Sequence, residues 1–287
     1  MKDKAFETLA WATRKLRGSG LKKVPGVSTI YDYLYKSLEP EGSIRLIDVG
    51  PFEMYLDTRD VGGITPNLMS KKGYHPFMTS LLPGIIKPGM TCIDIGANVG
   101  YFTIILSKLV RPLGIVYAFE PEPKNFRVLL ENTSILNLVS PYSCIPEQIA
   151  VGDKKGELKL YTTGYNFGGH SAHMESNESI DVEVTTLDKY LFGGQKVDFI
   201  KIDVEGYEPE VIEGMSSIID KNPNLVIILE HMPGQIDVKH LQSLEARSFT
   251  LYMIDEVERV MYPISSLSIK RTEPEEGVAF NILARRL

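Results

Sequence analysis

Apolar runs typical of strands alternate with helix-like spacing through the middle of this chain. One apolar run ends at Ile95, a turn follows at residues 96–100, and apolar residues then recur at helical spacing as far as Leu109. A second apolar run covers residues 114–119. Strand, turn, helix and strand in this order predict a βαβ unit with two parallel strands, around which the rest of the chain is organised.

Similar patterns predict the remaining elements. Pro146 falls inside a predicted strand over residues 142–151, and because proline donates no backbone hydrogen bond, this strand belongs at a sheet edge or a bulge. Nearly continuous apolar runs at 197–202 and 225–229 predict buried parallel strands. The segment between residues 254 and 278 is predicted to be a surface loop. Further strands are predicted at 43–49, 52–57, 249–254 and 278–284 and, by alternation, within 156–187, and further helices at 3–17, 28–38 and 238–246 and from Pro123 onward.

The first turn and the acid at the end of the second strand indicate a ligand. A dinucleotide-binding turn needs a glycine where Asn98 stands, so a pyrophosphate would be poorly bound. Gly96 suits a tight turn, Gly100 suits close helix packing, and Glu120 is placed to accept hydrogen bonds from two ribose hydroxyls. An adenosine without phosphates fits, and S-adenosylmethionine is such a ligand, with Asp94 able to meet its ammonium group. The alternative is a βαβ crossover that binds nothing.

Five motifs strengthen the first interpretation. They are DIGANVGYF, AFEPEPKNF, IAVGD, TTLDKYL and FIKIDVEGYE, in this order within residues 55–232. Together they resemble the FkbM family of S-adenosylmethionine-dependent methyltransferases. The resemblance implies a Rossmann-like class I methyltransferase fold, α/β, with a mostly parallel seven-stranded sheet of order 3-2-1-4-5-7-6 and helices on both faces. It also implies O-methylation of a hydroxyl on a sugar, a glycolipid or a polyketide-like molecule.

Three segments flank or interrupt the predicted core of this domain. We expect a helical and β-hairpin extension over residues 1–60 and an S-adenosylmethionine-binding methyltransferase domain over residues 61–287. Residues 61–83 are rich in glycine and proline and are expected to form a flap over a ligand. Residues 164–175 are expected to be either a functional loop or a disordered hairpin tip. At residues 74–76 the family more often has Tyr-Glu-Pro, so His75 is a departure whose effect on cofactor binding is open.

The predicted cofactor site gathers residues from the ends of several strands. Ligands of open α/β sheets bind beyond the carboxyl ends of the strands, and the strand ending before Asp203 is expected to neighbour the first one. Gln148 and Ala150 are placed beside the adenine by the resemblance alone. The predicted cofactor-binding residues are Asp94, Gly96, Ala97, Asn98, Gly100, Tyr101, Glu120, Pro121, Gln148, Ala150 and Asp203.

Methyl transfer to an alcohol also requires removal of the hydroxyl proton, by a general base or by a metal that lowers the pKa of the alcohol. The predicted catalytic residues are Asp203, Glu205 and His231, because they follow strands that should end beside the methyl group. Glu230 and, from the loop, His170 and His173 are further candidates. Asp203 and Glu205 could hold a divalent ion, but the sequence offers no second acidic pair to complete its shell, so metal-free base catalysis is predicted.

The composition limits which binding partners and which compartment are expected, and two rival functions stay open. With 37 acidic and 31 basic side chains the net charge is -6, which disfavours nucleic acid as a partner. Cys92 and Cys144 lie in apolar runs and are expected to be core residues in a reducing, cytoplasmic protein without an export signal. The basic end of the first helix is expected to dock on the protein itself or a partner, with peripheral membrane contact as the weaker alternative. A catalytically silent S-adenosylmethionine-binding protein and a nicotinamide-dependent oxidoreductase are the rival functions.

Overall fold

A computed structural model gives the fold of the chain. It describes residues 44–60, 63–69, 74–139, 144–163, 166–171, 179–192, 194–232, 237–269 and 279–287. The chain divides into two compact units, residues 1–73 with 164–168 and residues 74–163 with 169–287. The helices predicted at 3–17 and 28–38 lie outside the described residues, and the domain boundary expected at residue 60 stays a prediction.

The described part of the first unit contains the predicted hairpin. Strand β1 (Ile44–Asp48) pairs antiparallel with β2 (Glu53–Asp57), which confirms both predicted strands. A short helix, α3 (Thr65–Leu68), follows, and the Asp60 carboxylate accepts hydrogen bonds from the backbone N–H groups of Gly63 and Thr65 at its start.

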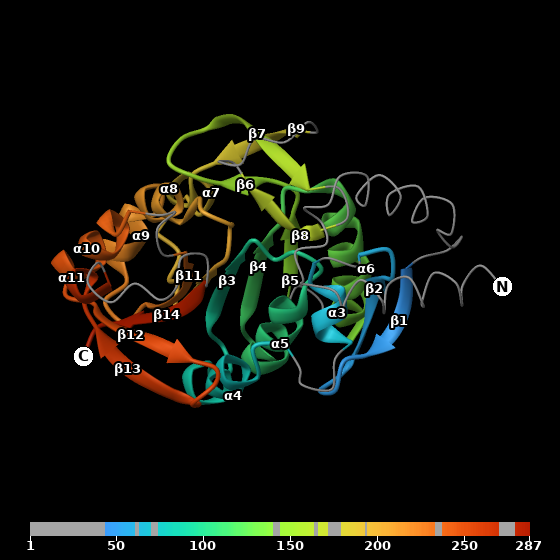
Figure 1. Ribbon diagram of the computed structural model, residues 1–287, viewed down its shortest axis with the longest axis horizontal. Coiled ribbons are helices and arrows are strands. Elements are labelled where there is room, and N and C mark those ends of the chain that lie inside the picture. Colours follow the sequence, from blue (N-terminus) through green and yellow to red (C-terminus); the bar gives the residue numbers. More distant parts are fainter. Residues whose placement is uncertain are drawn as a thin grey trace, which may run out of the picture. The chain divides into compact units, whose positions relative to one another are not determined.

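The second unit is built on a large, mostly parallel sheet (Figure 1). Its strands from one edge to the other are β13, β12, β14, β11, β10, β3, β4 and β5. The five strands from β11 to β5 run parallel to their neighbours, whereas β14, β12 and β13 pair antiparallel. The bounds are β3 (Thr91–Ile95), β4 (Ile115–Phe119), β5 (Cys144–Glu147), β10 (Phe199–Ile202), β11 (Val226–His231), β12 (Thr250–Asp255), β13 (Val260–Ile264) and β14 (Phe280–Arg285).

The sheet has eight strands, not the seven predicted. With β13 set aside, the remaining strands follow the order 3-2-1-4-5-7-6 when numbered along the chain. The prediction of a loop between residues 254 and 278 was wrong for its first part, which forms β13 and the short helix α11 (Ser266–Ile269). Pro263 lies within β13 at the sheet edge, a position at which proline, which lacks a backbone N–H, is tolerated.

Helices cover both faces of this sheet. Ile200 and Ile202 of β10 belong to the core cluster formed with the helices that follow β9 and β11. The alternate residues of the same strand, Phe199 and Lys201, line an apolar space with residues of the helices on either side of β3. One face is covered by α4 (Pro76–Ile85), α5 (Tyr101–Val110) and α6 (Pro123–Val139), and the other by α7 (Leu187–Tyr190), α8 (Glu208–Glu213), α9 (Ser216–Lys221), α10 (Lys239–Ala246) and α11.

A small second sheet follows β5. It comprises β6 (Ala150–Val151), β9 (Ser179–Thr185), β7 (Gly156–Thr163) and β8 (Asn166–Ser171), in this order. The strand predicted over 142–151 is therefore two strands in two sheets, because Cys144–Glu147 pairs with β4 whereas Ala150 pairs with Val184 of β9. The loop predicted over 164–175 contains β8, and residues 172–178 lie outside the described part.

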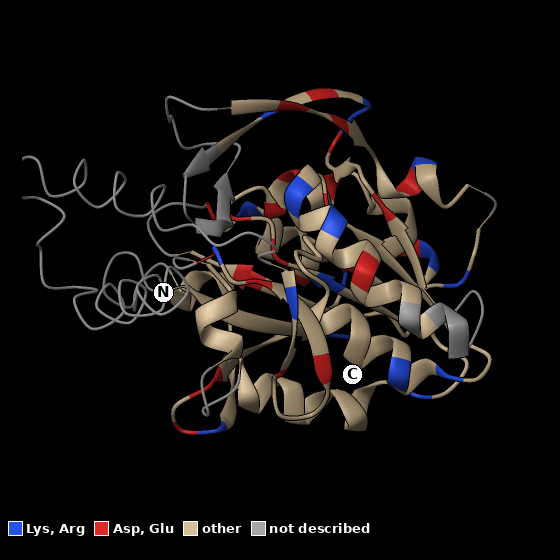
Figure 2. Cartoon of the chain, turned by 90° about the vertical axis from the view of Figure 1, so that its right-hand side faces the viewer, with Lys and Arg blue, Asp and Glu red and all other residues tan. Residues whose placement is uncertain are grey.

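The charged residues, the cysteines and the helix lengths can be compared with the expectations from composition. Figure 2 shows basic and acidic positions mixed along the described helices and strands, and Cys92 and Cys144 are buried free thiols, as predicted. Within the described ranges, no helix combines the length and the apolar character needed to cross a bilayer.

Candidate active site at the carboxyl edge of the sheet

The turn between β3 and α5 is folded onto the end of β4. The backbone N–H groups of Gly96 and Ala97 both donate to the carbonyl oxygen of Phe119, at 3.0 and 2.9 Å. Gly96, Asn98 and Gly100 all have positive φ angles, of 78°, 50° and 93°. A turn in this conformation brings successive backbone groups close to the tip of the neighbouring strand, where the sequence predicted the cofactor.

Gly96 is required by close packing of backbone against backbone. A Cβ at this position would lie 1.8 Å from the backbone oxygen of Asp203, the residue after β10. A Cβ on Gly100 would lie 2.8 Å from Leu129 of α6. The packing role expected for Gly100 is therefore present, and Gly96 brings the β3 turn against the end of β10, in addition to making the turn.

Glu120 holds the turn from the tip of β4. Its Oε2 accepts the backbone N–H of Asn98 at 2.8 Å and its Oε1 accepts that of Glu122 at 2.9 Å. Burial raises the pKa of Glu120 to about 7, although these N–H groups oppose the shift. Each carboxylate oxygen has a second lone pair, so the two oxygens that order the turn can also accept from a diol.

Lys201 and two aspartates form a buried ionic group between β3 and β10. The ammonium of Lys201 lies 3.0 Å from Oδ2 of Asp203 and 3.9 Å from Oδ1 of Asp94. The other oxygen of Asp94 accepts the Thr103 hydroxyl at 2.6 Å. Burial raises the pKa of Asp94, against the opposing charge of Lys201. Asp94 has no exposed surface, so its observed partners are Thr103 and Lys201, and a direct contact with a ligand ammonium is disfavoured.

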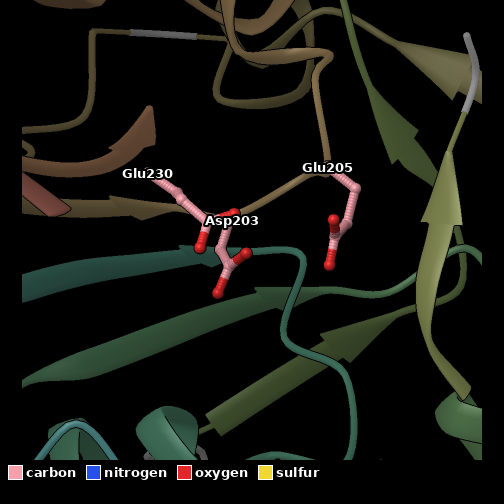
Figure 3. A group of neighbouring side chains, drawn as sticks. All are labelled: Asp203, Glu205 and Glu230. Atoms are coloured by element: carbon pink, nitrogen blue, oxygen red, sulfur yellow. The ribbon is translucent and has the colours of Figure 1, made fainter. Parts of the chain in front are cut away.

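Three further carboxylates meet at the same edge. Asp203, Glu205 and Glu230, which we name the edge carboxylates, offer oxygens within 4.8 Å of one another. Figure 3 shows the side chains of Asp203 and Glu230 next to each other, with Glu205 on the other side of Asp203. Burial, and next the charge of Asp203, raise the pKa of Glu205 to about 8 and that of Glu230 to about 9. Without a bound cation, the carboxyl groups of Glu205 and Glu230 therefore favour the protonated form at neutral pH.

The edge carboxylates have the chemistry of a site for a hard divalent cation, since such ions prefer oxygen ligands. The sequence identified Asp203 and Glu205 as a possible pair, and Glu230 of the neighbouring strand adds the third oxygen. Three carboxylates are also a suitable surface for an organic cation. The prediction of metal-free catalysis is not decided by this geometry and stays a prediction.

Comparison with known families identifies the chain. A profile described as "Methyltransferase FkbM domain" matches residues 94–261, which is more than half of the chain. The chain belongs to the FkbM methyltransferase family. The matched segment begins at Asp94 and includes Glu120, Lys201 and the edge carboxylates, and the fold is the Rossmann-like class I methyltransferase fold.

Two curated relatives and one solved structure are similar to this chain over part of its length. The hexuronic acid methyltransferase AglP of Haloferax volcanii is 30% identical over 154 residues, 53% of this chain and 59% of that protein. Methyltransferase 1 of Beauveria bassiana is 25% identical over 146 residues, 43% of this chain and 57% of that protein. This chain thus spans less than two thirds of the curated relatives it matches. A structure of TYW2 from P. horikoshii has 13% identity and a TM-score of 0.47, over 87% of this chain and 74% of that one.

His231 is not brought to the site in this FkbM-family chain. Successive residues of a strand face opposite sides of a sheet, so His231 points away from the side that carries Glu230. Its ring packs against those of His240 in α10 and Phe280 in β14, and it is only 1% exposed. Burial lowers the pKa of His231 to about 4. The sequence-based choice of His231 as a general base is therefore not supported by its placement, because a base must reach the acceptor hydroxyl.

The remaining predicted residues of the FkbM domain are dispersed. Tyr101 and Ala97 are buried near the turn, Pro121 is half-buried, and Gln148 is exposed between β5 and β6. Their contacts with a cofactor, and that of Ala150 in β6, stay predictions. Of the loop histidines, His170 lies in β8, where side chains are not described, and His173 is outside the described residues.

The start of α4 brings in Tyr74, to which the sequence analysis gave no role in the site, and His75, whose role it left open. Tyr74 packs edge-on against Tyr101, and burial, followed by the charges of Asp203 and Glu230, raises the pKa of its phenol well above the usual range. His75 has a positive φ of 42° at the helix N-terminus, and Glu256, after β12, accepts the N–H groups of Phe77 and of the next residue. The phenol of Tyr74 thus belongs to the surroundings of the edge carboxylates.

Proposed function

We propose that this protein transfers a methyl group from S-adenosylmethionine to a hydroxyl of a sugar, glycolipid or polyketide-like small molecule. Membership of the FkbM family supports the reaction class. The observation that carries the proposal is the closure of the β3 turn on two sides, onto Glu120 by hydrogen bonds and against Asp203 by backbone contact. The carboxyl edge of the sheet thereby presents Glu120, which can accept hydrogen bonds from a diol, together with the edge carboxylates.

The hydrogen-bonding capacity and the charge of the site residues suit S-adenosylmethionine. Glu120 retains lone pairs for the ribose hydroxyls, and Asn98, in place of the middle glycine of a dinucleotide turn, disfavours a pyrophosphate. The edge carboxylates and Asp94 carry more potential negative charge than the ammonium of Lys201 can balance. A ligand that brings a sulfonium and an ammonium group is therefore favoured over an anionic nucleotide.

When bound, the cofactor would supply an electrophilic methyl group, to which an acceptor oxygen bonds in line while the carbon–sulfur bond breaks and S-adenosylhomocysteine leaves. The chain then has to hold the acceptor and take its proton. Glu230 is the base that we assign, because it lies among the edge carboxylates and has the most strongly raised of their pKa values, about 9. A nearby positive charge lowers a carboxyl pKa, so cofactor binding should convert Glu230 to the carboxylate that can accept the proton.

The acceptor class is inferred from a relative and from charge. AglP is a methyltransferase of hexuronic acid, and a sugar hydroxyl is the chemistry that we carry over to this chain. The net charge of -6 and the acidic site disfavour nucleic acid, whose phosphates would be repelled. The assignment therefore names a hydroxylated small molecule or glycolipid and leaves its identity to experiment.

Labelled cofactor tests the proposed function. The purified protein is incubated with methyl-labelled S-adenosylmethionine and with extracts fractionated into sugars, lipids and polyketides, with and without a chelator. We expect label to enter a fraction as a methyl ether and the chelator to leave the rate unchanged. Cofactor binding without transfer to any hydroxylated fraction would indicate a silent binding protein. Transfer that stops with chelator and returns with a divalent metal would contradict metal-free catalysis.

A further inference from the structure

Lys201 occupies an unusual position for a lysine, in the centre of a parallel sheet. It is only 4% exposed, on β10 between two neighbouring strands. Its ammonium lies 4.8 Å from the centre of the Phe102 ring. Burial of a lysine is costly unless its charge is paired. The apolar space along its side is lined by Met78, Leu82, Phe102, Leu106, Phe199 and Ile228.

The apolar surroundings direct the ammonium toward two carboxylates. Lys201 is the direct neighbour of Asp94 in the register of β10 with β3. Its ammonium also lies 3.0 Å from the carboxylate of Asp203, two residues further along the chain and just past the end of β10. Burial by itself lowers the pKa of Lys201, but Asp203 and Asp94 outweigh this effect and the net pKa is raised. The lysine is therefore a permanent cation within the site.

The two carboxylates depend on Lys201 to different degrees. Asp94 has a second partner, the hydroxyl of Thr103 at 2.6 Å, and its distance to the ammonium is 3.9 Å. Among the described residues, the ammonium of Lys201 is the side-chain group that donates a hydrogen bond to the Asp203 carboxylate. Asp203 is also more exposed, with 21% of its side chain accessible. The orientation of the Asp203 carboxylate therefore depends mainly on this ion pair.

We propose that Lys201 is a positioning residue for methyl transfer, which fixes the carboxylate of Asp203 toward the acceptor side of the site and offsets the charge of its carboxylate neighbours. This inference rests on the proposed function, because Asp203 is placed beside the transferred methyl group only in that account. It assigns Lys201 no contact with cofactor or acceptor. Its effect on the reaction passes through Asp203.

A positioning role predicts a split between turnover and cofactor affinity. Lys201→Met keeps most of the side-chain length and removes the ammonium. Loss of one charge-assisted hydrogen bond should lower kcat roughly 10- to 100-fold. The Kd for S-adenosylmethionine should weaken by less than about threefold, because removal of a positive charge near a cationic ligand does not oppose its binding. A purely structural defect would instead lower the fraction of protein that binds, without changing kcat per bound molecule.

A double-mutant cycle with Asp203→Asn decides whether Lys201 acts through Asp203. We expect Lys201→Met with Asp203→Asn to be no slower than Asp203→Asn alone, within about threefold. Lys196→Met, a change at a side chain that is 74% exposed, serves as the matched control and should keep wild-type turnover. Rate losses that multiply in the double variant, or near-normal kcat in Lys201→Met, would overturn the proposal.

The same variants separate this proposal from the proposed function. If the wild type transfers no methyl group, the proposed function fails, and the cycle is then measured by thermal unfolding of the protein without ligand. A Tm loss in the double variant that is smaller than the sum of the single losses supports the Lys201–Asp203 pair. Additive losses show that Lys201 does not hold Asp203, and they overturn the inference without reference to catalysis.

Discussion

At the scale of single residues, Glu120 combines two tasks. Its carboxylate accepts two backbone N–H groups that order the turn after β3, and it is the side chain that we propose for binding the ribose hydroxyls. A side chain that is already held in place loses little entropy when a ligand binds. The acid at the tip of β4 is thus organised before the cofactor arrives.

Glu120→Ala should weaken cofactor binding. Loss of two ribose hydrogen bonds costs on the order of 1.5 to 3 kcal/mol, which corresponds to a roughly tenfold or greater rise in Kd. Calorimetric titration with S-adenosylhomocysteine measures the change. Glu131→Ala, on the exposed side of α6, is the control and should bind as the wild type does. An unchanged Kd in Glu120→Ala would remove the ribose assignment.

Two neighbouring residues of β11 should differ sharply in their effect on turnover. Glu230→Gln removes the proposed base and should lower kcat about 10²- to 10⁴-fold. His231→Ala should leave kcat within a few-fold of wild type once its lower stability is allowed for, because the ring is buried against His240. Steady-state kinetics at saturating cofactor measures both. The opposite ranking would restore His231 as the base.

Much of the site could be predicted from residue types, and the rest required strand register. The glycine-containing turn, Glu120 and Asp203 follow from local sequence, since each lies directly after an apolar run. The sequence analysis gave Lys201 no role within the buried strand predicted at 197–202, and its pairing opposite Asp94 in β3 is what gives it one. The placement of His231 does not support the sequence-based choice of this residue as the base, because strand alternation puts its side chain on the face of the sheet opposite to that of Glu230.

At the scale of elements, the site depends on close contact between the β3 turn and the end of β10. The backbone oxygen of Asp203 would lie 1.8 Å from any Cβ at position 96, and Gly96 also has a φ of 78°. Both features exclude a β-branched side chain. The contact places Asp203 next to the turn that is predicted to hold the cofactor.

Gly96→Val should therefore fold poorly and bind no cofactor. Separation of β3 from β10 would be needed to relieve the clash, and this would disrupt the centre of the sheet. Gly156→Val is the matched control, because a Cβ there meets nothing within 4 Å and φ is not positive. Circular dichroism on heating and calorimetry give the comparison. Wild-type affinity in Gly96→Val would place the cofactor turn elsewhere.

The sequence predicted long, strongly patterned elements better than short ones. The parallel strands β3, β4, β10 and β11 were correctly located, because their apolar runs are continuous and buried on both faces. The strand β13 was missed because its exposed, mixed residues, among them Pro263, lack a regular pattern. The split of residues 144–151 into β5 and β6 depends on partners in two different sheets.

At the scale of the whole molecule, ionisation of two site carboxyl groups opposes folding. The pKa values of Glu205 and Glu230 are raised to about 8 and about 9, from a usual value of 4.5, by burial and by neighbouring carboxylates. Between pH 4.5 and these raised values, Glu205 and Glu230 keep protons in the folded protein that they have released in the unfolded chain. The contribution of these two groups to the free energy of unfolding therefore falls as pH rises from about 4.5 toward about 9.

Glu230→Gln should remove part of this pH dependence. Without ligand, the variant should have nearly wild-type Tm at pH 5 and a higher Tm at pH 8, by about 2 to 4 °C for each kcal/mol relieved. Thermal unfolding across this pH range measures the difference. A Tm difference that is constant with pH, or that shrinks as pH rises, would show that Glu230 is not held protonated by its surroundings.

Direct titration with two competing ligand classes is the most decisive measurement. The central claim is that the edge formed by Glu120, the β3 turn and the edge carboxylates binds the methyl donor. Calorimetry of the wild type with S-adenosylhomocysteine should show one site per chain, whereas NADH should show no binding, because Asn98 stands where a pyrophosphate needs glycine. Binding of NADH without binding of S-adenosylhomocysteine would contradict the account.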